Sequence, residues 1–314
     1  MMIASLALAA ILSSSILPLP KATAATRTAY DERLAVLDTW ANQATGCASS
    51  AVRNGSCGRA CDEARIHSPR IATNATLETL ALSGRRSAHE CVVVFRGSKN
   101  AVNTLLDVYI VLASLDGCGG GCRVHSGFLH AWRSLQGSVT AQLTELGCAN
   151  STLSIVGHSL GGAVALLAAW DLSPMSQIGR VYTYGQPRVG NAAFAAAVDA
   201  RLASYGVAHY RVVDYKDAVP HLPWHHAFWQ GWTHNGQEVY YNATRLGMHT
   251  TCEGATDTRC SYRWTLLECL THTCDHCSYL GMNPCDCDAL QPHCKEPRAF
   301  GARPSIPRIF GAAA

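Results

Sequence analysis

The sequence has few charged residues, no basic patch, no internal repeat and no linker of biased composition. Charged residues make up 15% of the 314 residues, and the formal net charge is only +3. Lysine and arginine are scattered along the chain, so the basic patch that nucleic-acid binding requires is missing. No internal repeat and no linker of biased composition interrupts the chain, which argues against a repeat protein and favours one domain over two.

Long apolar runs are equally scarce. The only long one covers residues 3–17, which is shorter than the roughly 20 residues that cross a bilayer. It is followed by Ala22-Thr23-Ala24, a typical A-x-A cleavage pattern. We therefore predict a signal peptide at 1–24, a secreted mature protein and no transmembrane segment.

The remaining sequence has the composition of a folded globule. Hydrophobic residues make up 48% of the chain, enough to bury a substantial core. Residues 299–314 show no apolar pattern, unlike the chain before them. The sequence predicts a single domain over 25–295 and a disordered tail over 296–314.

Cysteine is abundant, with fifteen residues, all after position 46. This number suits an oxidising compartment where disulfides persist, and an odd count leaves at least one thiol without a partner in the chain. Four N-x-S/T sequons fit the same secretory route and predict a glycoprotein. They lie at Asn54, Asn74, Asn150 and Asn242.

Short runs of β-branched and aromatic residues alternate with segments of helical character. Buried strands are expected at 91–95, 153–156, 181–184 and 210–213. Helices are expected at 30–40, 131–146, 163–172 and 192–205. This alternation predicts an α/β fold with a mostly parallel sheet and right-handed crossovers.

A G-x-S-x-G sequence at 157–161 lies between one of these strands and a helix. In that context it is typical of a nucleophile elbow, in which a strained serine projects its hydroxyl from the top of a sheet. Ser159 is therefore a candidate nucleophile. The pentapeptide by itself is equally compatible with an ordinary turn.

A serine nucleophile needs an imidazole base and a carboxylate that orients the base. In the chain order Ser, Asp, His, the carboxylate follows a strand, and Asp217 is preferred there over Asp214. The residues alone do not select the histidine, because eight lie downstream. They are His221, His225, His226, His234, His249, His272, His276 and His293.

Six further stretches occur in a fixed order between about residues 30 and 290. They are 95–98 (FRGS), 124–128 (VHSGF), 156–162 (VGHSLGG), 184–190 (YGQPRVG), 217–223 (DAVPHLP) and 275–279 (DHCSY). In these stretches the chain resembles the class 3 lipase family, the secreted triacylglycerol lipases and esterases best known from filamentous fungi.

The resemblance implies an α/β-hydrolase fold and a Ser-Asp-His triad of Ser159, Asp217 and His276. It also implies an oxyanion hole made by Ser98 and the backbone N–H of Leu160. Neither a metal nor an organic cofactor is needed for this chemistry. The expected substrates are acylglycerols or other lipid esters at a lipid–water interface, with a feruloyl-type esterase, a phospholipase or an inactive lipid-binding protein as alternatives.

The same resemblance places an interfacial lid at 99–107, where Thr104 stands in place of the aromatic residue that family lipases often carry. Val102, Leu105 and Leu106 then form the apolar face of a short covering helix. From Val108 to Leu112 a buried strand is the favoured interpretation.

Family resemblance also implies disulfides Cys57–Cys61, Cys118–Cys122 and Cys252–Cys260, and one between Cys47 and a cysteine near the end of the chain, with Cys287 as the candidate. These bonds make the C-terminal segment disulfide-rich. The cysteines that are additions to the family pattern are Cys269, Cys274, Cys277, Cys285 and Cys294. A zinc site is the alternative for Cys269, Cys274 and Cys277 with His272 and His276, but the secretory start favours disulfides. One hypothesis is that a disulfide at Cys277 fixes the loop that carries His276.

Overall fold

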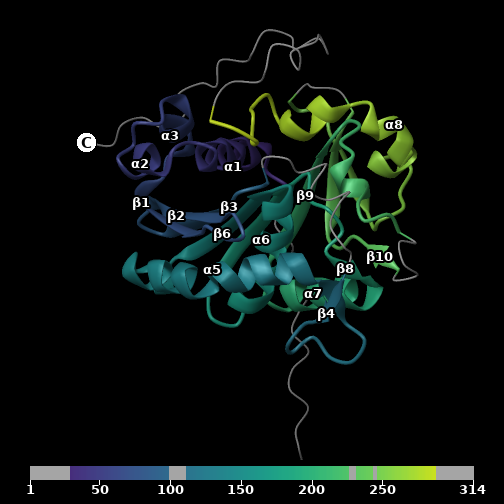
Figure 1. Cartoon of the computed structure of the whole chain (residues 1–314), viewed down its shortest axis with the longest axis horizontal. Coiled ribbons are helices and arrows are strands. Elements are labelled where there is room, and N and C mark those ends of the chain that lie inside the picture. The colour runs from purple at the N-terminus through teal and green to yellow at the C-terminus, as the bar shows by residue number, and fades with distance from the viewer. Residues whose placement is uncertain (1–28, 99–110, 226–230, 243–245, 288–314) are drawn as a thin grey trace, which may run out of the picture.

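The computed structural model describes residues 29–98, 111–225, 231–242 and 246–287 (Figure 1). Its main sheet contains β1 His67–Asn74, β2 Thr79–Ser87, β3 Glu90–Phe95, β6 Thr152–His158, β7 Ile178–Tyr184, β9 Ala208–Asp214, β11 Gln237–Tyr241 and β12 Thr250–Glu253. The order across this eight-stranded sheet is β1-β2-β3-β6-β7-β9-β11-β12. The strands from β3 to β11 are parallel, and the pairs at both edges are antiparallel.

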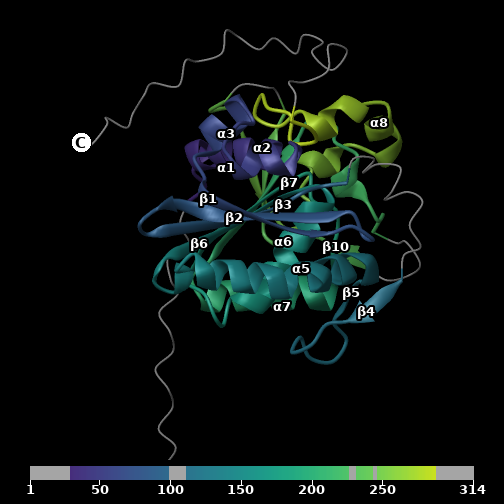
Figure 2. The same cartoon turned by 60° about the vertical axis from the view of Figure 1, so that its left-hand side comes forward.

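Helices cover both faces of this sheet. They are α1 Glu32–Thr45, α2 Ser49–Arg53, α3 Arg59–Ala64, α5 Ser126–Glu145, α6 Leu160–Leu172, α7 Ala192–Ser204 and α8 Leu266–Leu270. Figure 2 shows α1, α2 and α3 on one side of the sheet and α5 and α7 on the other. The two layers explain why most residues of the central strands are buried.

Strand β3 illustrates this arrangement, because successive side chains of a strand point to opposite faces. Val93 and Phe95 belong to the core shared with α5, α6 and α7. Val92 and Val94 belong to the second core, which is formed with α1, α2 and α3. From Cys91 to Phe95 the strand is buried on both faces and carries no charged side chain, as the sequence indicated.

A second, four-stranded sheet has the order β10-β8-β5-β4 and is antiparallel throughout. Its strands are β4 Leu112–Ser114, β5 Arg123–His125, β8 Gly190–Asn191 and β10 Trp232–Thr233. The expected buried strand at 108–112 is wrong where it can be judged. Val111 is 55% exposed, and β4 begins only at Leu112, which is partly buried.

The predicted α/β architecture with a mostly parallel sheet is confirmed. All four expected strands and all four expected helices are present, with ends that differ by a few residues. Strands β1, β2, β11 and β12 of the main sheet were not predicted. The signal peptide at 1–24, the lid at 99–107 and the tail at 296–314 lie outside the described residues.

The four disulfides implied by the family resemblance are present, including Cys47–Cys287, which joins residues 240 positions apart. In the chain-entropy model a loop of that size stabilises the fold by about 5 kcal/mol. The structure adds Cys91–Cys148, and the hypothesised disulfide at Cys277 is present, with Cys285 as its partner. Among the described cysteines, Cys269 is the free thiol that the odd count requires.

Within the described ranges, no helix combines the length and apolar character needed to cross a bilayer.

A buried ion network joins α1 to the sheet. Asp38 of α1 has no exposed side-chain surface and pairs with Arg86 of β2 and with Arg180 of β7, whose Nε lies 3.1 Å from its Oδ2. Glu90 of β3 completes the network through Arg180 Nη1, at 2.9 Å. Burial raises the pKa of Asp38, but Arg180 and then Arg86 outweigh burial and hold it below its ordinary value.

Asp38→Asn should therefore destabilise the protein strongly, because two buried guanidinium groups lose their shared counter-charge. We expect the free energy of unfolding at pH 7 to fall by about 3–5 kcal/mol in chemical denaturation. Asp257→Asn, in an exposed pair with Arg259, is the control and should leave the midpoint unchanged.

The difference in free energy of unfolding between wild type and Asp38→Asn should shrink as the pH falls. Because the folded pKa of Asp38 is lowered, its contribution is complete above about pH 4 and is lost as the pH falls toward the folded value. A difference between wild type and Asp38→Asn that does not shrink in acid would contradict this assignment.

Candidate active site

Ser159 lies between the end of β6 and the start of α6, as a nucleophile elbow requires. Its backbone has φ 57° and ψ −129°, a conformation that non-glycine residues rarely adopt. Its N–H donates to the carbonyl of Tyr184 at the end of β7, at 2.8 Å. The strained turn is thus held by the neighbouring strand.

Two positions of the motif must be glycine because a backbone carbonyl oxygen lies where a Cβ atom would be. A Cβ at Gly161 would lie 2.0 Å from the carbonyl oxygen of Phe95, and one at Gly157 would lie 2.1 Å from that of Gly161. No side chain fits at either position. The first turn of α6 can therefore pack directly on β3 and β6, which brings the end of β3 against the elbow.

Asp217 follows β9 and is fully buried. Its carboxylate accepts from Nδ1 of His276 at 2.9 and 3.0 Å, from the N–H of Val219 at 2.9 Å and from the hydroxyl of Tyr279. Burial raises the pKa of Asp217, but His276, Tyr279 and Val219 together hold it below its ordinary value. The group is an ionised carboxylate at neutral pH.

The alternative carboxylate, Asp214, is the last residue of β9. Its backbone carbonyl accepts from the N–H of Asp217 at 2.9 Å, so the two residues form one turn. The imidazole of His276 bonds to Asp217, which is the residue that the sequence favoured.

His276 lies in a short 3-10 helix, Thr273–Cys277, and is 3% exposed. Other downstream histidines contact different groups: His225 the Trp232 carbonyl, His234 the Pro220 carbonyl, His249 the Glu32 carboxylate and His272 the Asp275 carboxylate. Among the described histidines, His276 is the one that bonds to Asp217. His226 and His293 lie outside the described residues.

Two of the three candidate triad residues, Asp217 and His276, lie against Gly185, which follows Tyr184. A Cβ at Gly185 would lie 2.7 Å from Oδ2 of Asp217 and 3.1 Å from Cε1 of His276. The backbone N–H of Ser159 donates to the carbonyl of Tyr184, the residue before Gly185. Oγ of Ser159 and Nε2 of His276 are both buried and have no hydrogen-bond partner among the described residues. These are the two atoms that a serine–histidine hydrogen bond joins, and such bonds are often long without substrate.

The candidate oxyanion-hole residues flank the same turn. Leu160 is the first residue of α6, so its N–H has no acceptor within the helix. Ser98 follows Gly97, at which a Cβ would lie 3.0 Å from Cβ of Ser159. Leu160 is therefore next to Ser159 along the chain, and Ser98 is brought close to it because Gly97 packs against Ser159.

Two residues of this site were not assigned a role from the sequence. Tyr279 donates to Asp217 and is fully buried, and His158 packs its ring on that of His276 with centroids 4.6 Å apart. Tyr279 lies within the 275–279 stretch and His158 within the elbow motif. Their positions in these motifs could have marked them as site residues. Their roles were not evident, because their partners are distant in sequence.

Comparisons with known proteins agree with this geometry. The family model "Lipase (class 3)" matches residues 92–226. A lipase of Rhizomucor miehei is 34% identical over 224 residues, which cover 68% of this chain and 59% of the relative. The secreted mono- and diacylglycerol lipase 1 of Fusarium solani is 35% identical over 191 residues, which cover 58% and 55% respectively.

A solved triacylglycerol lipase, whose catalytic centre is described as a serine protease triad, superposes with a TM-score of 0.63 and 30% identity. The superposition covers 82% of this chain and 96% of that structure. The chain belongs to the class 3 lipase family. Its fold is accordingly the α/β-hydrolase fold. Its sequence matches span little more than half the length of the two curated relatives named above.

The zinc alternative does not fit the cysteines of this class 3 lipase. Cys277 is bonded to Cys285, and Cys274 is also in a disulfide, so neither offers a thiolate. In the part of the chain that the structure describes, no three His, Cys, Asp or Glu side chains are grouped to hold a metal ion.

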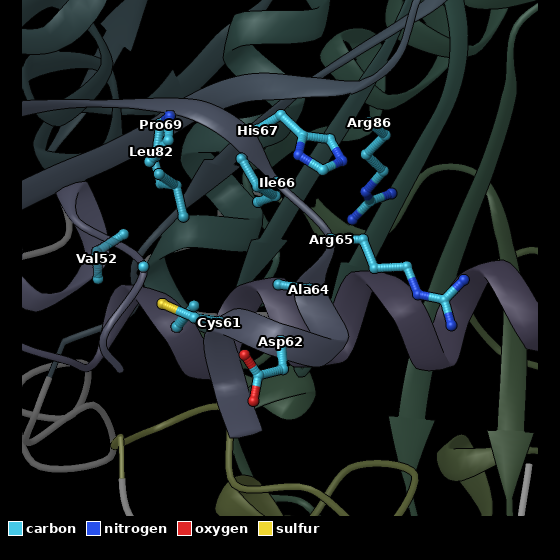
Figure 3. Close-up of a pocket in the computed structure, with 12 residues that line it drawn as sticks. Val52, Cys61, Asp62, Ala64, Arg65, Ile66, His67, Pro69, Leu82 and Arg86 are labelled. Carbon is cyan, nitrogen blue, oxygen red and sulfur yellow. The ribbon is translucent and has the colours of Figure 1, made fainter. Parts of the chain in front are cut away.

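A cavity of about 430 Å³ lies away from this site, between α2, α3, β1 and β2 (Figure 3). Val52 and Leu82 line one end, and Arg65 and Arg86 lie at the other. None of the candidate triad residues lines it.

The glycine requirement at the elbow can be tested by stability. Gly161→Ala should lower the free energy of unfolding by about 3 kcal/mol or more, because the new methyl group overlaps the Phe95 carbonyl and overpacking of this kind forces the backbone apart. Gly137→Ala is the matched control. Gly137 lies inside α5, and a methyl group added there would meet open space, so alanine should stabilise by up to about 1 kcal/mol. Equal effects of the two substitutions in denaturant titrations would argue against the packing described here.

Proposed function

We propose that this class 3 lipase is a secreted serine hydrolase that cleaves the ester bonds of acylglycerols through Ser159, His276 and Asp217. The observation that carries the proposal is the buried Asp217–His276 hydrogen bond beside a serine in a strained elbow. The substrate class follows from the names of the relatives, which are triacylglycerol and mono- and diacylglycerol lipases. Secretion is supported by the relative named as secreted and by the disulfides.

The geometry suits general-base catalysis by His276. Its Nδ1–H donates to the Asp217 carboxylate, so Nε2 carries the lone pair that removes the proton of the Ser159 hydroxyl. The serine oxygen then bonds to the ester carbonyl carbon, and the carbonyl oxygen becomes an oxyanion. When the tetrahedral intermediate collapses, His276 returns the proton to the departing alcohol. Water, deprotonated by His276 in turn, releases the fatty acid from the acyl-enzyme.

Asp217 keeps its negative charge through this cycle because its pKa is held low by its hydrogen-bond donors. The carboxylate fixes the tautomer of His276 and stabilises the imidazolium that forms during the reaction. The fully buried position of Asp217 strengthens this interaction, since little water screens it.

The oxyanion is stabilised in this proposal by the N–H of Leu160 and by Ser98. The N-terminus of α6 contributes the positive end of the helix dipole at the same place. Donors fixed before the reaction need no reorganisation, and loss of one typically costs about 2.7–4 kcal/mol of transition-state stabilisation.

Ser159 has no exposed surface, so a bulky ester reaches it only after part of the protein moves. A lipid–water interface is the setting we propose for that movement. It is the environment in which acylglycerols are presented.

The triad assignment is tested by replacing each residue. Ser159→Ala should lower kcat about 10⁶-fold, as loss of the nucleophile does in a serine protease. His276→Ala should lower kcat to a similar extent, whereas His272→Ala, four residues away and paired with Asp275, should stay within a few-fold of wild type. Rates on emulsified tributyrin and labelling by a fluorescent phosphonate are the measurements.

Two results would contradict the assignment. A phosphonate adduct on Ser159→Ala would place the nucleophile elsewhere, and full activity of His276→Ala would exclude it as the base. An unlabelled wild type under conditions where a reference lipase reacts would favour an inactive lipid-binding protein.

The substrate class is tested by a hydrolysis profile across triolein, a phosphatidylcholine and methyl ferulate. We expect triolein to be cleaved fastest, with kcat/KM at least about tenfold above methyl ferulate, equivalent to about 1.4 kcal/mol of transition-state discrimination. Preference for methyl ferulate without any increase on emulsified lipid would identify a feruloyl-type esterase instead. Preference for phosphatidylcholine would identify a phospholipase.

A further inference from the structure

The base His276 lies in a segment with little regular structure. The chain from β12 to residue 287 contains only α8, two 3-10 turns and one isolated bridge between Tyr279 and Met282. A five-residue 3-10 helix carries His276 itself. No strand of the sheet fixes this backbone, so its position depends on individual contacts.

One contact comes from the nucleophile side. Nε2 of His158, the residue before Ser159, lies 2.7 Å from the backbone carbonyl oxygen of His276. A carbonyl only accepts, so Nε2 carries the proton and donates. The two imidazole rings also pack with their centroids 4.6 Å apart at 34°.

His158 makes this contact as a neutral ring. Burial, and then the neighbouring His276, lower the pKa of His158 to about 3. A neutral neighbour does not repel the imidazolium that His276 becomes during catalysis, whereas a cationic one would do so.

A second contact is made to the same carbonyl by a disulfide. The disulfide Cys277–Cys285 begins at the residue after His276, and Sγ of Cys285 lies 3.9 Å from the His276 carbonyl oxygen. The closed loop contains Tyr279, whose hydroxyl donates to Asp217. One covalent loop therefore holds the backbone of the base and the donor to the acid.

We propose that His158 and the Cys277–Cys285 disulfide together clamp the backbone of His276 and are positioning elements for the base. This inference rests on the proposed function. The clamp links the strand that carries the nucleophile to the loop that carries the base, so that the imidazole stays in register with Ser159. Its loss acts on the geometry of the reacting groups rather than on substrate binding, and lowers kcat with little change in KM.

The His158 contact is tested with two replacements. His158→Phe keeps a ring of similar shape but removes the donor, and kcat on soluble p-nitrophenyl butyrate should fall about 10²-fold, the effect of a misplacement of about 1 Å. KM should stay within about threefold, because ground-state binding is untouched. His158→Gln supplies an amide N–H toward the same carbonyl and should recover most of the lost kcat.

The disulfide is tested against a matched control in the same chain. Cys277–Cys285 and Cys252–Cys260 both join residues eight positions apart, so their removal costs the same loop entropy. The double variant C277A/C285A should lower kcat by about tenfold or more, the loss of orientation expected at a freed base. The double variant C252A/C260A should lose a similar amount of thermal stability and keep the kcat of wild type.

Wild-type kcat in either His158→Phe or C277A/C285A would overturn the clamp, and so would equal kcat losses in the two double-cysteine variants. If C277A/C285A does not fold, the comparison of His158→Phe with His158→Gln decides: a loss without rescue by Gln counts against the clamp. Phosphonate labelling separates this result from the proposed function. An inert wild type overturns both, whereas a reactive wild type with an unimpaired His158→Phe overturns the clamp alone.

Discussion

The buried hydrogen bond between Asp217 and His276 is the interaction on which the rest of the site depends. A fully buried carboxylate is costly unless several donors compensate it, and here the donors are Val219, two residues along the chain, and His276 and Tyr279 from one distant segment. The sheet order places Asp217 near the elbow. Strands β6, β7 and β9 are parallel neighbours, so the elbow after β6, the turn at Gly185 after β7 and Asp217 after β9 lie at one edge.

The elbow and the segment that carries His276 are held by different physical means. Ser159 is fixed by backbone packing, since glycines at 157 and 161 allow helix α6 to approach β3 and β6 more closely than any side chain permits. The segment carrying His276 has no such scaffold and is tied by covalent and polar links. Cys252–Cys260 lies before it, Cys277–Cys285 beside it and Cys47–Cys287 after it, where the last bond joins it to the end of helix α1. Helix α1 is in turn docked on the sheet by the Asp38 network.

Much of this could be predicted because the relevant signals are local. Each central strand is largely buried and contains a short run rich in β-branched and aromatic residues, and the elbow motif spans five consecutive residues. The edge strands β1 and β12 were missed because each is mostly exposed and lacks the apolar run of a buried strand. The pairing Cys91–Cys148 and the partner of Cys277 were not predicted, because a disulfide depends on distances that spacing in sequence does not give.

The sequence by itself determined the alternation of strands and helices, the strained serine turn and the choice of Asp217 over Asp214, since each rests on neighbouring residues. Tertiary structure decided which of many histidines meets Asp217, because the residues alone left all eight open and only a family resemblance selected His276. It also brought His158 and Tyr279 into the site. These contacts join residues 59 to 118 positions apart, and only the folded sheet brings such residues within hydrogen-bond distance.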